Sequence, residues 1–359
     1  MSDMQLCREE YWEKKRAELT ADDLAGLRRE ADRCLAAPGF SVVFKEAPAL
    51  SGDPHDYVSL SIYDWPNPDT PDGMPWIHRD GVINPDWAKY DSPSLGAMCR
   101  SVGTLSAAGK LTGETRYCEK AGRLLKCWFL DPETAMTPHL NFAQFIPGRS
   151  KGNTWGLIDS HPFCELFEAA GSLPFNPEWT PGELERLRQW ATEYFFWLIS
   201  DPSPVKEERA PGNHGTWYDA QFVALALFLG YPDLARRQIR EKSIPRLSTQ
   251  LLNNGQQPFE IARTLSLSYS TFNLTAWSKL AAYAKLLGME LWVLPSDDQA
   301  TLRNAFHYLL PYLTGKAEWE FLQAGPMPAA DRLFSLVDDF LEPVDAKFRP
   351  CFSCICPRT

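Results

Sequence analysis

Hydrophobic residues along the chain recur mostly with the period of an α-helix. The clearest apolar stripes run over residues 24–35, 95–105, 117–128 and 184–198. Two stripes follow N-terminal signals: Thr20 precedes Asp23 at the third helical position, and Thr180-Pro181-Gly182-Glu183 combines a cap, a proline and a capping-box acid. The same period predicts further helices over 217–229, 233–243, 271–287, 299–313 and 328–340.

Alternation typical of β-strands is scarce. Its best example, residues 57–63, runs directly into the proline-rich stretch WPNPDTPDGMP, which excludes a central strand or a helix there. Residues 63–90 are therefore expected to form a long surface loop and a candidate lid, and residues 345–359 an irregular tail. The pattern predicts one all-α domain over 1–359, and periodicity alone leaves open an α/α toroid or an α-solenoid.

Charge and composition indicate which kinds of ligand the protein is expected to bind. The net charge of −10 argues against non-specific binding to nucleic acid or an anionic membrane, and no run approaches the ~18 apolar residues of a membrane span. An acidic ligand would need a local cluster of basic residues against this overall sign. The 13 tryptophans serve either core packing or a cleft in which sugar rings stack.

The cysteines and histidines show no metal-site or disulfide pattern. Nine cysteines form no disulfide framework, and the six histidines lack zinc spacing, so we expect no metal and no cofactor. The tail cluster Cys351, Cys354 and Cys356 is expected to be structural or incidental rather than a soft-metal site. The polar N-terminus shows no signal segment, which favours a cytoplasmic protein, with a secreted or periplasmic protein lacking its signal as the alternative.

Three polar segments are candidates for chemistry. Asn213 and His214 lie at or just before a predicted helix start, where backbone N–H groups favour anions. Taken by itself, the Asn-His-Gly segment is more typical of a simple turn capped by Asn213. Arg263 and Tyr269 are six residues apart, about 120° around one straight helix, so they can share a site only if the segment bends. The third segment, residues 141–151, interleaves amides with apolar residues and ends in a basic pair.

Four ordered stretches together resemble the alginate-lyase superfamily of polysaccharide lyases. They are DYVSLSIYDW at 56–65, the segment 117–148, NHGTWYDAQFVALALFLG at 213–230 and QPFEIARTLSLSYSTFN at 257–273. The NHGTWYD wording and the Arg-x5-Tyr spacing are most similar to polysaccharide lyase family 38, a neighbour of family 5, which acts on glucuronan and mannuronate-rich alginate. The resemblance implies an incomplete (α/α) barrel, or toroid, and an acidic polysaccharide as the partner.

The resemblance also implies catalytic roles for Tyr269 as acid and base, aided by Asn213, His214 and Arg263. These residue types suit β-elimination from a uronate. An amide and an imidazole can hydrogen-bond the carboxylate beside the C5 proton, and an arginine favours the phenolate that removes this proton. Polymers with the C5 proton and the C4 oxygen on one side, namely mannuronan and glucuronan, then need only one tyrosine.

Other residues are candidates for substrate binding, and two other functions remain as alternatives. The candidates for substrate binding are Asn141, Gln144, Arg149, Lys151, Trp155, Tyr57 and Arg79. One alternative is an (α/α)-barrel glycoside hydrolase that uses two carboxylates such as Asp159 and Glu260. Another is a non-catalytic carbohydrate-binding homologue. Endo or exo action, the preferred polymer and the oligomeric state are not indicated by the sequence.

Overall fold

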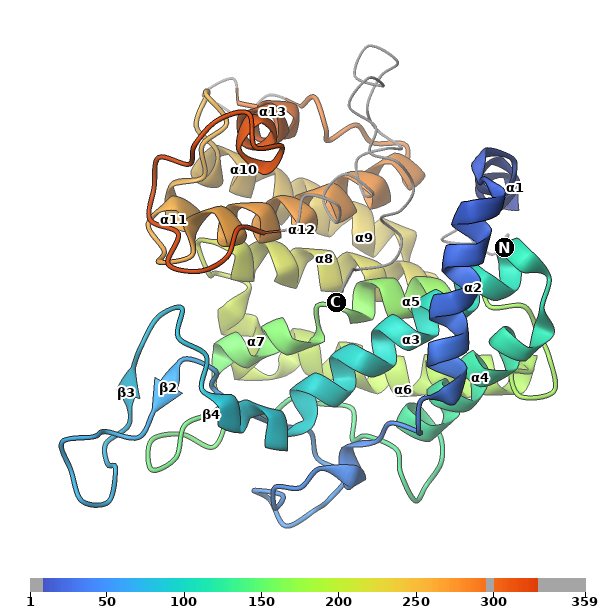
Figure 1. Cartoon of the computed structure of the whole chain (residues 1–359), viewed down its shortest axis with the longest axis horizontal. Coiled ribbons are helices and arrows are strands. Elements are labelled where there is room, and N and C mark those ends of the chain that lie inside the picture. The colour runs from blue at the N-terminus through green and yellow to red at the C-terminus, as the bar shows by residue number, and fades with distance from the viewer. Residues whose placement is uncertain (1–8, 295–299, 329–359) are drawn as a thin grey trace. The chain divides into compact units, whose positions relative to one another are not determined.

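Helices dominate the computed structural model, which describes residues 9–294 and 300–328 (Figure 1). The predicted helix at 328–340 lies, apart from its first residue, outside the described residues, as do the tail 345–359 and its three cysteines. Within the described part of the chain, no helix has the length and apolar character needed to cross a membrane.

The chain divides into two compact units. Unit 1 consists of Met1–Glu207 and Leu227–Gly230, and unit 2 consists of Glu208–Ala226 and Tyr231–Thr359. The expectation of one domain over the whole chain stays a prediction.

Unit 1 is built around a long central helix, α3. Its apolar stripe at 95–105 is buried as predicted, and α3 contacts α2, α4 and α5. The two predicted capping boxes start α2 and α6, because each threonine hydroxyl and the acid three residues later satisfy N–H groups at the helix start. The α-helices of this unit are α1 (Glu9–Glu18), α2 (Ala21–Ala36), α3 (Asp91–Thr112), α4 (Thr115–Phe129), α5 (Phe163–Gly171), α6 (Pro181–Ser200) and α7 (Pro202–Glu207).

Four short strands and three 3-10 helices complete unit 1 as far as its residues are described. β1 (Val58–Leu60) pairs in parallel with β4 (Phe142–Phe145), and β2 (Asp64–Trp65) pairs antiparallel with β3 (Ile77–His78). Figure 1 shows β2 and β3 as two short arrows joined by the loop that carries Pro66, Pro68, Pro71 and Pro75. The 3-10 helices are η1 (Val42–Phe44), η2 (Pro85–Lys89) and η3 (Thr154–Ser160).

The segment 63–90 is therefore more ordered than a plain loop. The prediction was wrong in this respect, because its prolines lie outside the two-residue strands and so remove none of their ladder hydrogen bonds. A buried Asp64 ties the segment down by accepting a hydrogen bond from Ser61.

The described residues of unit 2 carry the other helices, and only the last two residues of α8 belong to unit 1. The predicted helix at 217–229 is α8 and begins four residues earlier, at Asn213. The predicted helix at 233–243 continues to residue 250 through a π-helical turn, η4, that joins α9 to α10. The elements are α8 (Asn213–Phe228), α9 (Pro232–Gln238), η4 (Ile239–Ser243), α10 (Ile244–Gln250), α11 (Pro258–Ile261), α12 (Ser266–Leu286) and α13 (Leu302–Leu313).

Candidate active site

The four predicted catalytic residues all lie in unit 2. Asn213 and His214 are the first two residues of α8, Arg263 lies between α11 and α12, and Tyr269 lies in the first turn of α12. The side chains of His214, Arg263 and Tyr269 are partly exposed, whereas Asn213 is buried.

The break between α11 and α12 brings Arg263 onto Tyr269. The Arg263 Nη2 atom donates a hydrogen bond of 2.8 Å to the Tyr269 hydroxyl, and the guanidinium carbon lies 3.9 Å from the centre of the ring. This is the bent segment that the six-residue spacing requires. A cation this close to a phenol stabilises its deprotonated form.

The start of α12 is fixed by a segment that follows α13. The Gln323 side-chain oxygen accepts hydrogen bonds from the main-chain N–H groups of Leu267 and Ser268 at 3.1 and 3.4 Å. It thereby acts as an N-cap supplied from a distant part of the chain. The main chain of Ala324 also donates to the Thr264 carbonyl at 2.9 Å. These contacts set the position from which Tyr269 projects.

Glu260 joins the two parts of the site. Its Oε1 accepts the main-chain N–H of Asn213 at 2.7 Å, and its Oε2 accepts from the Asn213 Nδ2 at 2.8 Å. The Glu260 side chain is buried, and burial raises the pKa of its carboxyl. The hydrogen bonds from Asn213 and the nearby charges of His214 and Arg263 oppose this shift of the pKa.

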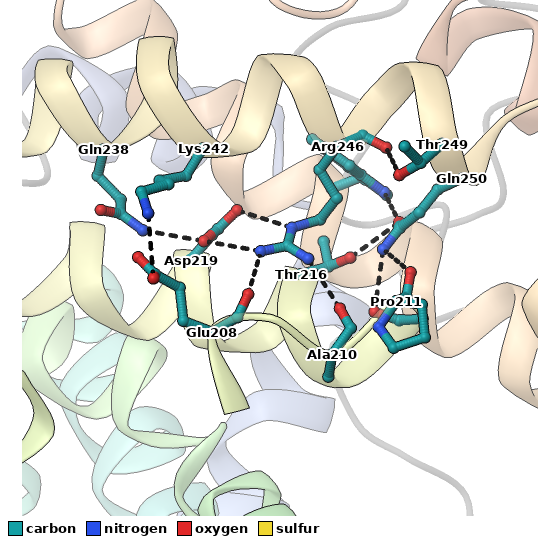
Figure 2. Close-up of polar contacts among 12 residues, drawn as sticks. Glu208, Ala210, Pro211, Thr216, Asp219, Gln238, Lys242, Arg246, Thr249 and Gln250 are labelled. Atoms are coloured by element: carbon teal, nitrogen blue, oxygen red, sulfur yellow. Dashed lines mark hydrogen bonds and ion pairs between the residues drawn. The ribbon is translucent and has the colours of Figure 1, made fainter. Parts of the chain in front are cut away.

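A buried ion pair supports the loop that leads into α8. Arg246 of α10 contacts Asp219 of α8 at 3.0 Å and also donates to the carbonyls of Ala210 and Glu208, at 2.8 and 2.7 Å. Figure 2 shows these bonds meeting around the guanidinium, and the Asp219 carboxylate lies between Arg246 and Gln238, which also donates to it. The Arg246 guanidinium thus links α8, α10 and residues 208–210.

Gln250, at the end of α10, holds the next part of this loop. Its Nε2 donates to the carbonyls of Pro211 and Gly212, both at 2.9 Å (Figure 2). Its Oε1 accepts from Thr216 of α8 at 2.9 Å. Because Arg246 and Gln250 are one helical turn apart, one face of α10 fixes residues 208–212 immediately before Asn213.

The candidates for substrate binding lie in unit 1, and two of them converge on Asp159. The buried Tyr57 donates to Asp159 at 3.1 Å, Gln144 donates to it at 2.8 Å, and Ser59 donates to the same carboxylate. Burial raises the pKa of Tyr57, with the Asp159 charge adding to the shift. The hydroxyl of Tyr57 thus donates to Asp159 inside the protein, and the role of Tyr57 in substrate binding stays a prediction.

The Gln144 backbone adopts a φ of 49°, in the left-handed region that is uncommon for residues other than glycine. Such conformations concentrate at functional sites, because surrounding contacts must hold them in place. The main-chain N–H of Gln144 donates to the Ser59 hydroxyl at 2.7 Å.

The other five candidates are exposed. Asn141 accepts a hydrogen bond from the Trp197 indole at 2.8 Å, and the Arg79 guanidinium lies 5.1 Å from the centre of the Trp65 ring. Arg149, Lys151 and Trp155 lie exposed in and after the turn that follows β4. Their role in binding stays a prediction.

No local sequence pattern indicates which side chains hold these catalytic candidates in place. From the sequence, Glu260 is expected only as one carboxylate of the alternative hydrolase, and no role is predicted for Arg246 or Gln250. The Glu260–Asn213 pair spans 47 positions, and no local period links residues that far apart.

In the described part of the chain, no group of three or more His, Cys, Asp or Glu side chains could hold a metal ion.

Comparisons with known proteins assign the family. The family model described as "Alginate lyase" matches residues 42–319. An alginate lyase from Bacteroides ovatus is 33% identical, with 100% of both chains covered and a TM-score of 0.91. A variant of alginate lyase A1-III complexed with a tetrasaccharide is 13% identical, with 94% of this chain and 86% of that chain covered and a TM-score of 0.57. No curated protein matches this chain.

The family model and the alginate lyase from Bacteroides ovatus define the class of this protein. The predicted all-α fold class, that of the (α/α)-toroid lyases, is confirmed, and the protein is a polysaccharide lyase. The chain belongs to the alginate lyase family. Membership of this family argues against both the hydrolase and the non-catalytic alternative. The two carboxylates that a hydrolase would use, Glu260 and Asp159, each accept hydrogen bonds from neighbouring groups of the protein.

Proposed function

We propose that the protein cleaves a 1,4-linked polymer of β-D-mannuronate or β-D-glucuronate by syn β-elimination, with Tyr269 as both base and acid. The observation that carries this proposal is the contact of Arg263 with Tyr269, at 2.8 Å between Nη2 and the hydroxyl. Without the cation, the phenolate needed to remove a C5 proton would be scarce at neutral pH.

The proposed reaction breaks the C5–H bond and the bond between C4 and the leaving oxygen, and it forms one C4–C5 double bond. The Tyr269 phenolate takes the proton from C5, the electrons of that bond form the C4–C5 double bond, and the bond from C4 to the leaving oxygen breaks. The phenol then passes its proton to the leaving oxygen, which regenerates the phenolate. General acid–base assistance of this kind contributes about 10²–10⁴ in rate.

The negative charge that builds up on the uronate carboxylate needs donors. Asn213 and His214 lie at the N-terminus of α8, a helix of 16 residues, where the helix dipole favours an anion. We assign the amide and the imidazole to hydrogen bonds with this carboxylate, which strengthen as the C5 proton leaves. The partly exposed position of His214 is compatible with contact to a substrate.

The substrate class follows from stereochemistry rather than from the fold. One tyrosine suffices only where the C5 proton and the C4 oxygen lie on the same side of the ring, as in mannuronate and glucuronate. Guluronate has the opposite C5 configuration and would need a base and an acid on opposite faces. The name of the family and the tetrasaccharide bound to alginate lyase A1-III support an acidic polysaccharide as substrate. The cytoplasmic compartment, with export as the alternative, stays a prediction.

A panel of polymers tests the proposal. Purified protein is incubated with polymannuronate, polyglucuronate and polyguluronate, and both ultraviolet absorbance and reducing ends are followed. We expect unsaturated product from the first or the second polymer and much less from the third. New reducing ends without absorbance would show hydrolysis instead, and a clear preference for polyguluronate would exclude the one-tyrosine mechanism.

A further inference from the structure

The pair formed by Glu260 and Asn213 suggests a function for a carboxylate that the proposed elimination does not use. We propose that Glu260 is a positioning residue that orients the Asn213 side-chain amide, so that an N–H bond of the amide rather than its carbonyl is presented to the uronate. This inference rests on the proposed function.

The geometry of the pair determines which end of the amide faces Glu260. An ionised carboxylate can only accept hydrogen bonds, so the partner atom on Asn213 must be the nitrogen. One hydrogen of Nδ2 points to Oε2 at 2.8 Å, and the main-chain N–H of the same residue points to Oε1 at 2.7 Å. The two bonds fix both the residue and the rotation of its amide, and they leave the second hydrogen on Nδ2 for another acceptor.

The Asn213 carbonyl oxygen indicates that this rotation is imposed. The Oδ1 atom is buried and has no hydrogen-bond partner among the described residues. A buried acceptor without a partner costs free energy, so the amide alone would not choose this orientation. The Glu260 carboxylate enforces it, because the flipped amide would place two acceptors against each other.

The surroundings are built for close approach of this carboxylate. A Cβ atom on Gly212 would lie only 2.7 Å from Oε1 of Glu260, so a side chain at this position would displace the carboxylate. Burial raises the pKa of the Glu260 carboxyl, and the two hydrogen bonds from Asn213, with the charges of His214 and Arg263, oppose this rise and favour the ionised, acceptor-only form. Both features preserve the state in which the amide nitrogen faces Glu260.

Glu260→Gln separates positioning from stability. The glutamine side chain offers one acceptor and one donor in nearly the same shape. The Asn213 amide can then flip, its Oδ1 gains a partner, and its nitrogen turns away from the position that it holds in the native protein. The variant should therefore fold as well as the native protein and yet lose the donor to the developing charge.

Steady-state kinetics on the preferred polymer, read by ultraviolet absorbance, test this inference, with Glu241→Gln on the exposed surface of η4 as the matched control. We expect Glu260→Gln to lower kcat about 10²–10³-fold, the loss typical of one oxyanion donor, with KM changed less than about threefold. The urea midpoint should not fall. A kcat near that of the native protein would overturn the inference, as would a loss of activity that follows a lower urea midpoint.

A double-variant cycle identifies the route of the effect. If Glu260 acts through Asn213, then Glu260→Gln should cost less than about twofold when it is added to Asn213→Ala. Independent, multiplicative losses would overturn the inference. Tyr269→Phe keeps this outcome apart from the proposed function: an active Tyr269→Phe removes the mechanism itself, whereas an inactive Tyr269→Phe beside a fully active Glu260→Gln removes only the role of Glu260.

Discussion

Arg246→Met is expected to weaken the fold of unit 2 and the loop before Asn213 together. The substitution keeps an unbranched side chain but removes the cation from Asp219, whose side chain is 0% exposed. It also removes the hydrogen bonds to the Ala210 and Glu208 carbonyls. Removal of one partner from a buried ion pair typically costs about 3–5 kcal/mol, because an uncompensated charge is left behind. We therefore expect a loss of about 3–5 kcal/mol in the free energy of unfolding.

Urea unfolding followed by tryptophan fluorescence measures this loss, with Arg240→Met at an exposed position of η4 as the control. The control should change the free energy of unfolding by less than about 0.5 kcal/mol. Burial already raises the pKa of Asp219, and Arg246 opposes that rise. Without Arg246 the folded-state pKa of this carboxyl rises further above its unfolded value, so the deficit should grow as pH increases. A loss below about 1 kcal/mol at neutral pH would refute this account of the pair.

Three further predictions concern packing, pH and the cation beside the phenol. Gly215→Ala should destabilise the protein in urea titrations, because the new Cβ atom would lie 2.2 Å from the Ala210 carbonyl oxygen. The control Gly103→Ala in α3 adds a Cβ atom that meets nothing within 4 Å, and it should stabilise the protein by up to about 1 kcal/mol. Burial raises the pKa of Asp91 from 3.8 to about 7, so its contribution to the free energy of unfolding is full below pH 3.8 and is lost as pH rises towards 7. Asp91→Asn should remove that component of the pH dependence of urea unfolding. Arg263→Lys should lower kcat at least about tenfold, because an ammonium cannot both stack on the ring and donate to the hydroxyl.

Local signals predicted the longer helices of this protein but not α1, α5, α7 or α11. The helix starts after Thr20 and Thr180 were visible because a cap and its acid lie within four residues of each other. The start of α8 was placed too late, because the residues between Asn213 and Phe222 carry no simple apolar stripe. The hairpin within residues 63–90 was missed, since strands of two residues are too short to show alternation.

The candidate site was predictable in its residues but not in its supporting contacts. The six-residue spacing of Arg263 and Tyr269 indicated that the chain must bend there, and it does. The contact between Glu260 and Asn213 and the cap supplied by Gln323 join positions 47 and 56 residues apart. Periodicity describes the faces of one element and carries no information about which distant element packs against it. Tertiary structure was needed to find these partners.

The rate at which Tyr269→Phe forms unsaturated product from polymannuronate or polyglucuronate tests the central claim most directly. Tyr231→Phe, at a side chain 52% exposed before α9, is the matched control. The account predicts that Tyr269→Phe unfolds at the same urea concentration as the native protein but loses at least about 10³-fold in kcat, while the control keeps full activity. Activity of Tyr269→Phe close to that of the native protein would contradict the account, because no phenol would then be needed to move the C5 proton.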